Sequence, residues 1–182
     1  MSERVFEGLA TVSQQPQRGM VTLRGDLSAA KFKKAVAGVS GLDVPGMGAC
    51  VAGDARTVAW MSPDELLLMG PHESVGEDVT ALEKALKGTH HLVQDVSDAR
   101  AIYRIEGAAC RDVVAKLCPV DLAPDAFGPG KFRRTRIAQV ACAFWMPDEA
   151  SFELVAFTSV ADYVWGVLNT AADPGSAVGH FA

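Results

Sequence analysis

Apolar and polar residues alternate along the first half of the chain in two ways, and each way predicts a different kind of element. Apolar residues three or four positions apart are typical of a helix that buries one face, whereas short apolar stretches bounded by Gly, Pro or Asp are typical of strands. The predicted elements, in chain order, are a strand over 20–25, a helix over 28–38, a loop over 42–48, strand material over 49–61, a strand over 65–70, a helix over 73–88 and a strand over 90–96. Ser28 is the predicted N-cap of the first helix, and Gly88 is expected to end the second in a left-handed conformation.

The same order of elements begins again near residue 101. The second series is a strand over 101–107, a helix over 108–118, a Pro/Gly loop over 119–130, strand material over 134–146 and 151–157, and a helix over 159–171 capped by Ser159. Gly25 matches Gly107, Asp43 matches Asp121 and Trp60 matches Trp145, at offsets of 82, 78 and 85 residues. The small drift falls in loops, where insertions cost little. This order is also common enough to arise by chance.

The repetition predicts an α+β fold built from two similar units, each with an antiparallel sheet covered by helices on one side. Two copies are too few for a solenoid, which leaves two closely fused units that can together form one domain. The predicted organisation is an N-terminal extension over 1–19, a first unit over 20–98, a second unit over 99–172 and a C-terminal tail over 173–182. The tail is short and rich in small residues, so we expect it to be frayed or docked on a partner.

A Pro-Asp-Glu triplet follows a Trp-Met pair in both halves, in "WMSPDELLLMG" at 60–70 and "WMPDEASFEL" at 145–154. Proline fits the second position of a type I turn and aspartate the third, so Pro63 and Pro147 are both predicted to begin hairpin turns. The alternative is an enzyme that uses carboxylates, built on Asp64, Glu65, Asp95 and Asp98. The repetition favours the turn.

The only dense basic cluster is "KFRRTR" at 131–136. On a strand, Arg134 and Arg136 would share one face and Arg133 would lie on the other. Guanidinium groups suit a carboxylate-rich partner or an anionic ligand, which makes Arg133, Arg134 and Arg136 a candidate subunit interface. Equally, charge on an edge strand protects against aggregation.

Composition narrows the remaining classes of function. Hydrophobic residues make up 49% of the 182 residues, yet no apolar stretch is long enough for a membrane span, and residues 1–19 do not resemble a signal peptide, so we expect a cytoplasmic protein. A net charge of −5 gives no support to nucleic-acid binding. The four cysteines and four histidines lack metal-ligand spacing, which predicts no metal site. Ser97 between Asp95 and Asp98 is more typical of a turn than of a catalytic site.

Several motifs in order resemble a known family. Residues 95–168 are similar to the folate-binding fold of glycine-cleavage aminomethyltransferases, through "DVS" at 95–97, a strand ending at Gly107, the helix "ACRDVVAKL" and "VDLA" at 120–123. With "WMSPDELLL" and "TSVADYVWGVL" added, residues 18–172 resemble the gamma subunits of heterotetrameric sarcosine oxidases. The resemblance implies a small, cofactor-free subunit beside alpha, beta and delta subunits, which are expected to hold FAD, FMN, NAD, tetrahydrofolate and zinc.

The complex so implied demethylates sarcosine oxidatively to glycine, giving hydrogen peroxide and formaldehyde or methylene-tetrahydrofolate. Folate-using relatives carry acidic residues in a hairpin where residues 136–145 contain no Asp or Glu. We therefore assign no catalytic and no cofactor-binding residue to this chain. The isolated chain could self-associate. The alternative function is a stand-alone folate- or small-molecule-binding protein that uses a crevice between the two units.

Overall fold

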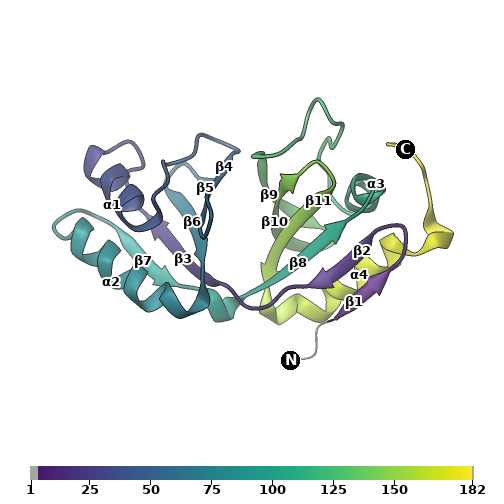
Figure 1. The fold of residues 1–182 in the computed structure, drawn as a ribbon, viewed down its shortest axis with the longest axis horizontal. Helices are drawn as coiled ribbons and strands as arrows, with labels where there is room; N and C mark the ends of the chain where they lie inside the picture. Colours follow the sequence, from purple (N-terminus) through teal and green to yellow (C-terminus); the bar gives the residue numbers. More distant parts are fainter. Residues whose placement is uncertain (1–3, 182) are drawn as a thin grey trace. The chain divides into compact units, whose positions relative to one another are not determined.

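The computed structural model describes residues 4–181, which form two compact units (Figure 1). The first unit comprises residues 17–97 and is continuous in sequence. The second unit comprises residues from 98 onward together with the N-terminal residues up to 16. The chain therefore passes between units after Ser97, one residue before the predicted boundary, and the N-terminal residues belong with the second unit.

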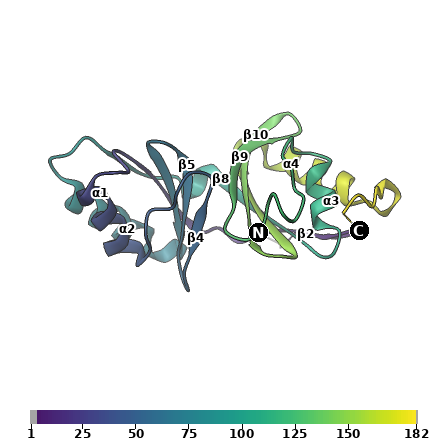
Figure 2. The same cartoon turned by 90° about the horizontal axis from the view of Figure 1, so that it is seen from above.

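A five-stranded antiparallel sheet in the order β4-β5-β6-β3-β7 forms the first unit, and helices α1 and α2 cover one face of it (Figures 1 and 2). Its core lies between helices and sheet and includes Phe32, Leu66 and Leu82. The elements are β3 (Gly19–Arg24), α1 (Ala30–Ser40), β4 (Cys50–Ala52), β5 (Thr57–Ser62), β6 (Glu65–Gly70), the 3-10 turn η1 (His72–Ser74), α2 (Val75–Leu86) and β7 (Leu92–Asp95).

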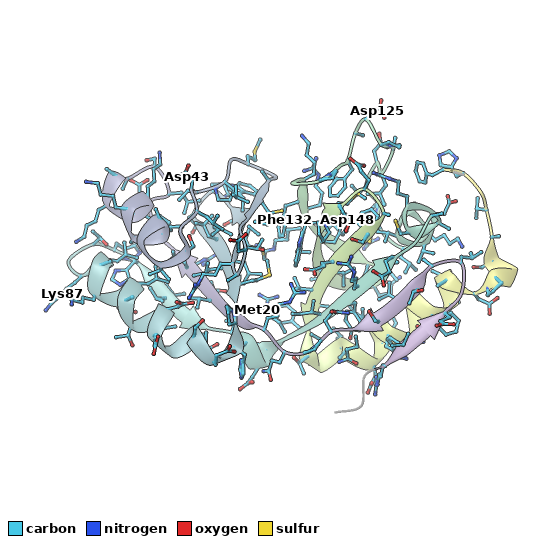
Figure 3. All side chains as sticks on the ribbon, in the orientation of Figure 1. Met20, Asp43, Lys87, Asp125, Phe132 and Asp148 are labelled. Atoms are coloured by element: carbon cyan, nitrogen blue, oxygen red, sulfur yellow. The ribbon has the colours of Figure 1, made fainter. Side chains whose placement is uncertain are left out.

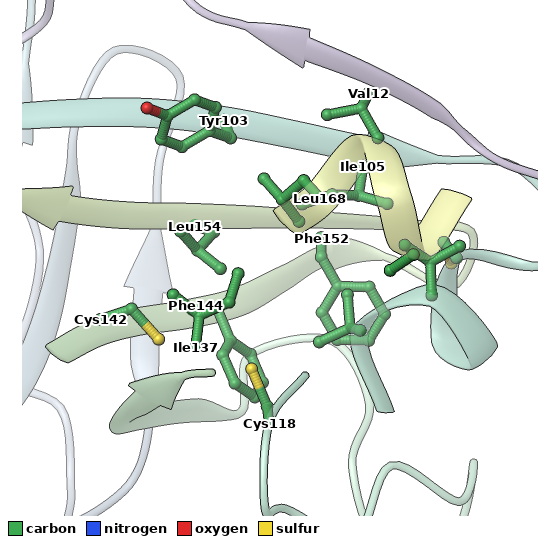
Figure 4. Packing of buried hydrophobic residues seen from close by; sticks show 14 of the residues in the cluster. Val12, Tyr103, Ile105, Cys118, Ile137, Cys142, Phe144, Phe152, Leu154 and Leu168 are labelled. Carbon is green, nitrogen blue, oxygen red and sulfur yellow. The ribbon is translucent and has the colours of Figure 1, made fainter. Parts of the chain in front are cut away.

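A six-stranded antiparallel sheet in the order β1-β2-β8-β11-β10-β9 forms the second unit. The rings of Phe127, Phe144 and Phe152 meet in its core with centroids 5.3 to 6.1 Å apart. Figure 4 shows Phe144 and Phe152 among the buried residues of this core. The elements are β1 (Val5–Glu7), β2 (Thr11–Gln14), η2 (Ser97–Ala99), β8 (Arg100–Glu106), α3 (Cys110–Ala115), β9 (Phe132–Ile137), β10 (Val140–Asp148), β11 (Ser151–Phe157), η3 (Thr158–Val160), α4 (Ala161–Ala172) and η4 (Pro174–Ser176). The 3-10 turn η2 spans the boundary between the units.

The two sheets confirm the predicted duplication. The strand order β4-β5-β6-β3 in the first unit repeats as β9-β10-β11-β8 in the second. Beside β3 lies β7, which follows α2 in the chain, but the equivalent place beside β8 is filled by β2 from the N-terminus. Val12 of β2 is fully buried in the second core, so residues 4–16 are part of this unit and not an extension outside it.

The C-terminal tail docks on its own unit, contrary to the expectation that it would fray or need a partner. The backbone N–H groups of His180 and Phe181 donate to one carboxylate oxygen of Asp112, at 3.0 and 3.2 Å. Phe181 also packs against the second core. A buried carboxylate that accepts hydrogen bonds from the tail holds it in place despite its small residues.

Neither predicted N-cap serine caps its helix. Helix α1 begins after Ala29, because the Ser28 hydroxyl and N–H both donate to the Asp26 carboxylate in a tight turn, at 2.6 and 2.9 Å. Ser159 lies in the 3-10 turn that precedes α4, and Val160 occupies the N-cap position. Gly88 has the expected left-handed backbone, with φ of 83°, one residue beyond the C-cap of α2.

Candidate functional site

The first Pro-Asp-Glu triplet forms a hairpin turn, as predicted. Pro63 and Asp64 connect β5 to β6 between the paired residues Ser62 and Glu65. The Ser62 hydroxyl donates to Asp64 at 2.6 Å, which fixes the turn from within. Arg24 on the neighbouring strand β3 lies opposite Glu65 and binds its carboxylate at 2.9 Å.

The environment of these carboxylates opposes a role as general acid. The hydrogen bond from the Ser62 hydroxyl, helped by the charge of Arg24, lowers the pKa of Asp64 below its usual range. Glu65 is largely buried, and Arg24 supplies the opposite charge beside it. General acid catalysis near neutral pH needs a raised carboxyl pKa, whereas the pKa of Asp64 is lowered. Glu65 forms an ion pair with Arg24, which is a structural role.

The second triplet is placed differently from the prediction. Pro147 lies inside β10, and the turn is formed two residues later by Glu149 and Ala150, between Asp148 and Ser151. Asp148 is labelled in Figure 3. Both hairpins bulge after the matching tryptophan, but the second is one residue longer on each strand. Asp148 takes over the turn by accepting hydrogen bonds from the Ala150 N–H and the Ser151 hydroxyl, at 2.9 and 2.8 Å.

An arginine on the strand that matches β3 in the duplication neutralises the carboxylates beside this hairpin too. Arg104 of β8 binds Glu106 at 2.7 Å and Asp148 at 3.3 Å and lies 3.9 Å from Glu153. The hydrogen bond to Glu106 and the surrounding acids raise the pKa of Arg104, whereas the hydrogen bond from Ser151 lowers that of Asp148. Each hairpin therefore carries an aspartate with a lowered pKa beside an arginine. Sequence reasoning missed both Arg24 and Arg104, which only strand register could have revealed.

The segment that holds Asp95 and Asp98 forms a turn, and the Asp95 carboxylate stabilises it. Asp95 accepts hydrogen bonds from the N–H and hydroxyl of Ser97, at 2.9 and 2.5 Å, in the turn predicted for this segment. The Ser97 oxygen in turn accepts the N–H of Met20 at 2.9 Å. The backbone oxygen of Asp98 accepts the Thr158 hydroxyl at 2.9 Å. Within the first unit, Glu65 pairs with Arg24 on one side of β3, whereas Asp95 pairs with Val21 on the other side and three residues away along the strand. The carboxylates of the hairpin and of this turn are therefore not gathered into one site in that unit.

The three candidate interface arginines lie on β9, which ends the order of strands in the second sheet. All three are exposed, as expected for a charged edge strand. Arg133 turns toward the core face, where its guanidinium lies 5.7 Å from the centre of the Phe127 ring and donates to the Phe132 carbonyl. Arg134 and Arg136 form no ion pair within residues 4–181.

A cleft of about 630 Å³ opens in the first unit, where the end of β3 meets α1 and the segment before β7. The lining residues are Arg24, Gly25, Asp26, Ala29, Lys31, Phe32, Asp64, Leu86, Thr89, His90, His91 and Leu92. Several of its polar groups bind protein atoms, since Lys31 donates to the Lys87 carbonyl at 2.6 Å and His91 contacts Glu83 at 3.0 Å. The cleft has the size of a small-molecule site, with an apolar wall and a charged rim.

Neither thiols nor metal ligands gather into a reactive centre in the part of the chain that is described. All four cysteines are buried and none forms a disulfide. Contact with Cys118 and burial raise the pKa of the Cys142 thiol, and burial raises the pKa of the Cys110 thiol. Such thiols stay protonated and react slowly. Across residues 4–181, no group of three His, Cys, Asp or Glu side chains is placed to hold a metal ion. No helix in this range is long and apolar enough to cross a membrane.

Comparison with known protein families shows to which family the chain belongs. The model of the family described as sarcosine oxidase, gamma subunit, matches residues 24–174. This chain belongs to that family. A relative in the family, sarcosine oxidase subunit gamma of Corynebacterium sp. (strain U-96), is 31% identical over 131 residues, which are 71% of this chain and 63% of the relative. The subunit gamma of Arthrobacter sp is 35% identical over 122 residues, 65% of this chain and 58% of that protein. The aligned region thus spans less than two thirds of these gamma subunits.

Solved structures agree with the family and with the predicted fold. A chain of the heterotetrameric sarcosine oxidase from Corynebacterium sp. U-96, in complex with pyrrole 2-carboxylate, has a TM-score of 0.84 at 27% identity, covering 93% of this chain and 86% of that one. The glycine cleavage system aminomethyltransferase T of Bartonella henselae has a TM-score of 0.61 at 14% identity, covering 83% and 43%. The similarity to aminomethyltransferase T shows a shared fold, which confirms the predicted resemblance to the aminomethyltransferase fold.

Proposed function

We propose that this gamma-family chain is a subunit of a heterotetrameric sarcosine oxidase, assembled in the cytoplasm with alpha, beta and delta subunits. The TM-score of 0.84 over 93% of the chain, to a protein solved as a heterotetrameric sarcosine oxidase, carries the proposal. The reaction of the complex would be the oxidative demethylation of sarcosine to glycine.

Within the complex, we assign this chain a role in assembly and none in the chemistry. Its hairpin carboxylates are held by Arg24 and Arg104, and its thiols are buried, which supports that assignment. FAD, FMN, NAD, tetrahydrofolate and zinc would then be held by the other subunits.

Co-expression tests the proposal. We expect the chain to elute with the alpha, beta and delta subunits of its own organism as one species in gel filtration, at a fixed ratio. The isolated chain, mixed with sarcosine and oxygen, should release no hydrogen peroxide, because it would hold no redox group. A chain that never joins the other three subunits would contradict the proposal.

The cleft in the first unit favours one other function, that of a protein binding small molecules by itself. Titrating folinic acid against the isolated chain separates the two, because a ligand of the native state raises the unfolding temperature. The assembly role predicts no shift. A saturable rise that disappears when a cleft residue such as Lys31 is changed to Glu would favour the binding function.

A further inference from the structure

The outer edge of β9 is an open hydrogen-bonding edge. No strand within residues 4–181 pairs with it, since β9 ends the sheet and bonds only to β10. The strand at the equivalent place in the first unit, β4, has three residues, whereas β9 has six. Short edge strands resist pairing with other chains. Of these two matching edge strands, β9 is therefore the one long enough to pair with a strand of a partner.

The pairing register shows which groups face outward. Ile137 and Val140 flank a two-residue turn and therefore form a hydrogen-bonded pair. Hydrogen-bonded and non-bonded pairs alternate along the ladder, so Arg134 and Arg136 direct their backbone N–H and C=O groups away from β10. The Phe132 carbonyl, next in the same series, accepts a hydrogen bond from Arg133, which leaves the open stretch beginning at Arg134.

The charges beside this edge indicate the chemistry of its occupant. Arg134 and Arg136 are exposed, lie on the same face two residues apart, and have no acidic partner in the described chain. The whole chain carries a net charge of −5, so this cluster is a local exception. A second copy paired along the same edge would set arginines beside arginines, which is unfavourable.

We propose that β9 accepts an extended strand of a partner subunit, bearing acidic side chains at alternate positions opposite Arg134 and Arg136. The backbone groups of the two residues would bond to the added strand, while their guanidinium groups pair with its carboxylates. The proposal rests on the function proposed above and specifies how the chain joins its complex.

Hydrogen exchange on the assembled complex tests strand addition without any mutation. The backbone amides of Arg134 and Arg136 should exchange at least about tenfold more slowly in the complex than in the isolated chain, because they become hydrogen-bonded. Equal exchange in the two states would overturn strand addition. Protection that appears in the isolated chain and grows with its concentration would show a second copy as occupant, and would also overturn it.

Charge reversal tests the acidic partner. R134E/R136E should weaken assembly by about tenfold or more, because repulsion replaces attraction across the new pair. K33E/K34E changes the net charge equally at exposed lysines of α1 and should leave assembly unchanged. R134P should weaken assembly more than R134Q, since it removes the outward amide as well as the charge. The unfolding temperature of each isolated variant shows that it is folded.

The outcomes separate this inference from the function on which it rests. If the wild-type chain joins the complex but R134E/R136E assembles as well as K33E/K34E, the arginines only guard an edge strand, and the inference fails alone. If the wild-type chain does not join the complex, the proposed function fails and strand addition with it.

Discussion

Two glycines at matching positions of the duplication are required for different physical reasons. Gly107 has φ of 121°, a backbone conformation that side chains with a Cβ rarely adopt. At Gly25 the constraint is space, because an added Cβ would lie 2.9 Å from the Phe32 ring. The two matching glycines therefore have different roles: Gly25 makes room for a close contact with α1 in the first unit, and Gly107 allows a turn in the second.

Alanine at Gly25 and at Gly38 should have opposite effects on stability. Gly25→Ala forces Phe32 to move and should cost about 1–3 kcal/mol. Gly38 lies on the exposed face of α1 with nothing within 4 Å of an added Cβ, so Gly38→Ala should add about 0.5–1 kcal/mol by favouring the helix. Denaturant midpoints of the isolated chain measure both. Equal effects would mean that Phe32 does not restrict Gly25.

His91 should make the stability of the first unit depend on pH. Its ring nitrogens contact the Thr89 carbonyl at 2.9 Å and the Glu83 carboxylate at 3.0 Å. The backbone contact with Thr89, followed by that with Glu83, raises the pKa of His91 above its ordinary value of 6.5. A raised folded-state pKa contributes stability that is fully present below pH 6.5 and is lost as the pH rises through the folded value.

His91→Gln should therefore lower the unfolding temperature more at about pH 5.5 than at about pH 8.5. His72→Gln is the matched control, since His72 lies in the 3-10 turn η1 away from Glu83 and should give a similar small change at both values. Thermal melts of the isolated chain across this range provide the measurement. A deficit for His91→Gln that grows toward high pH would show that the ring is neutral in the folded state.

At the level of individual elements, the apolar patterns predict the helices and the strands that follow residue 19, but they miss β1 and β2 and predict the connections less well. Ser28 and Ser159 are the predicted N-caps, but each N-cap lies one residue later, because Ser28 binds Asp26 and Ser159 lies in the 3-10 turn at 158–160. The strand material predicted over 134–146 contains a hairpin at Ala138, whose φ is 47°. Neither Gly nor Asn marks that turn, so residue type carries no signal there. The turn predicted at Pro147 is wrong. The residues around Pro147 match those around Pro63, but the second hairpin is longer, so its turn forms after Pro147.

Strand β2, which comes from the N-terminal residues, should contribute substantially to the stability of the second unit. Val12 of β2 is fully buried, whereas Val5 of β1 is 50% exposed. Val12→Ala removes buried methyl groups and leaves a cavity, and should lower the free energy of unfolding by about 2 kcal/mol. Val5→Ala should cost less than about 0.5 kcal/mol. Urea denaturation distinguishes them, and equal small losses would mean that β2 is dispensable.

Across the full chain, the duplication is visible in the sequence because each copy needs the same order of apolar elements to build its sheet and core. The order of motifs is also typical of the gamma-subunit family. The order of motifs does not reveal how the second sheet is completed. In the described residues of the second unit, β2 from the N-terminus fills the place that β7 fills in the first unit. Strand pairing joins residues far apart in sequence, and local patterns carry no record of the partner.

Local patterns of residues establish the two α+β units, the apolar faces of their helices, the first hairpin turn and the single dense cluster of arginines. These properties follow from spacing along the chain and from the conformational limits of Gly and Pro. Packing between distant segments establishes that Arg24 and Arg104 neutralise the hairpin carboxylates, that Asp112 holds the tail, and that β9 presents an open edge. No local pattern contains this information, because charge pairing and burial are set by neighbours in space.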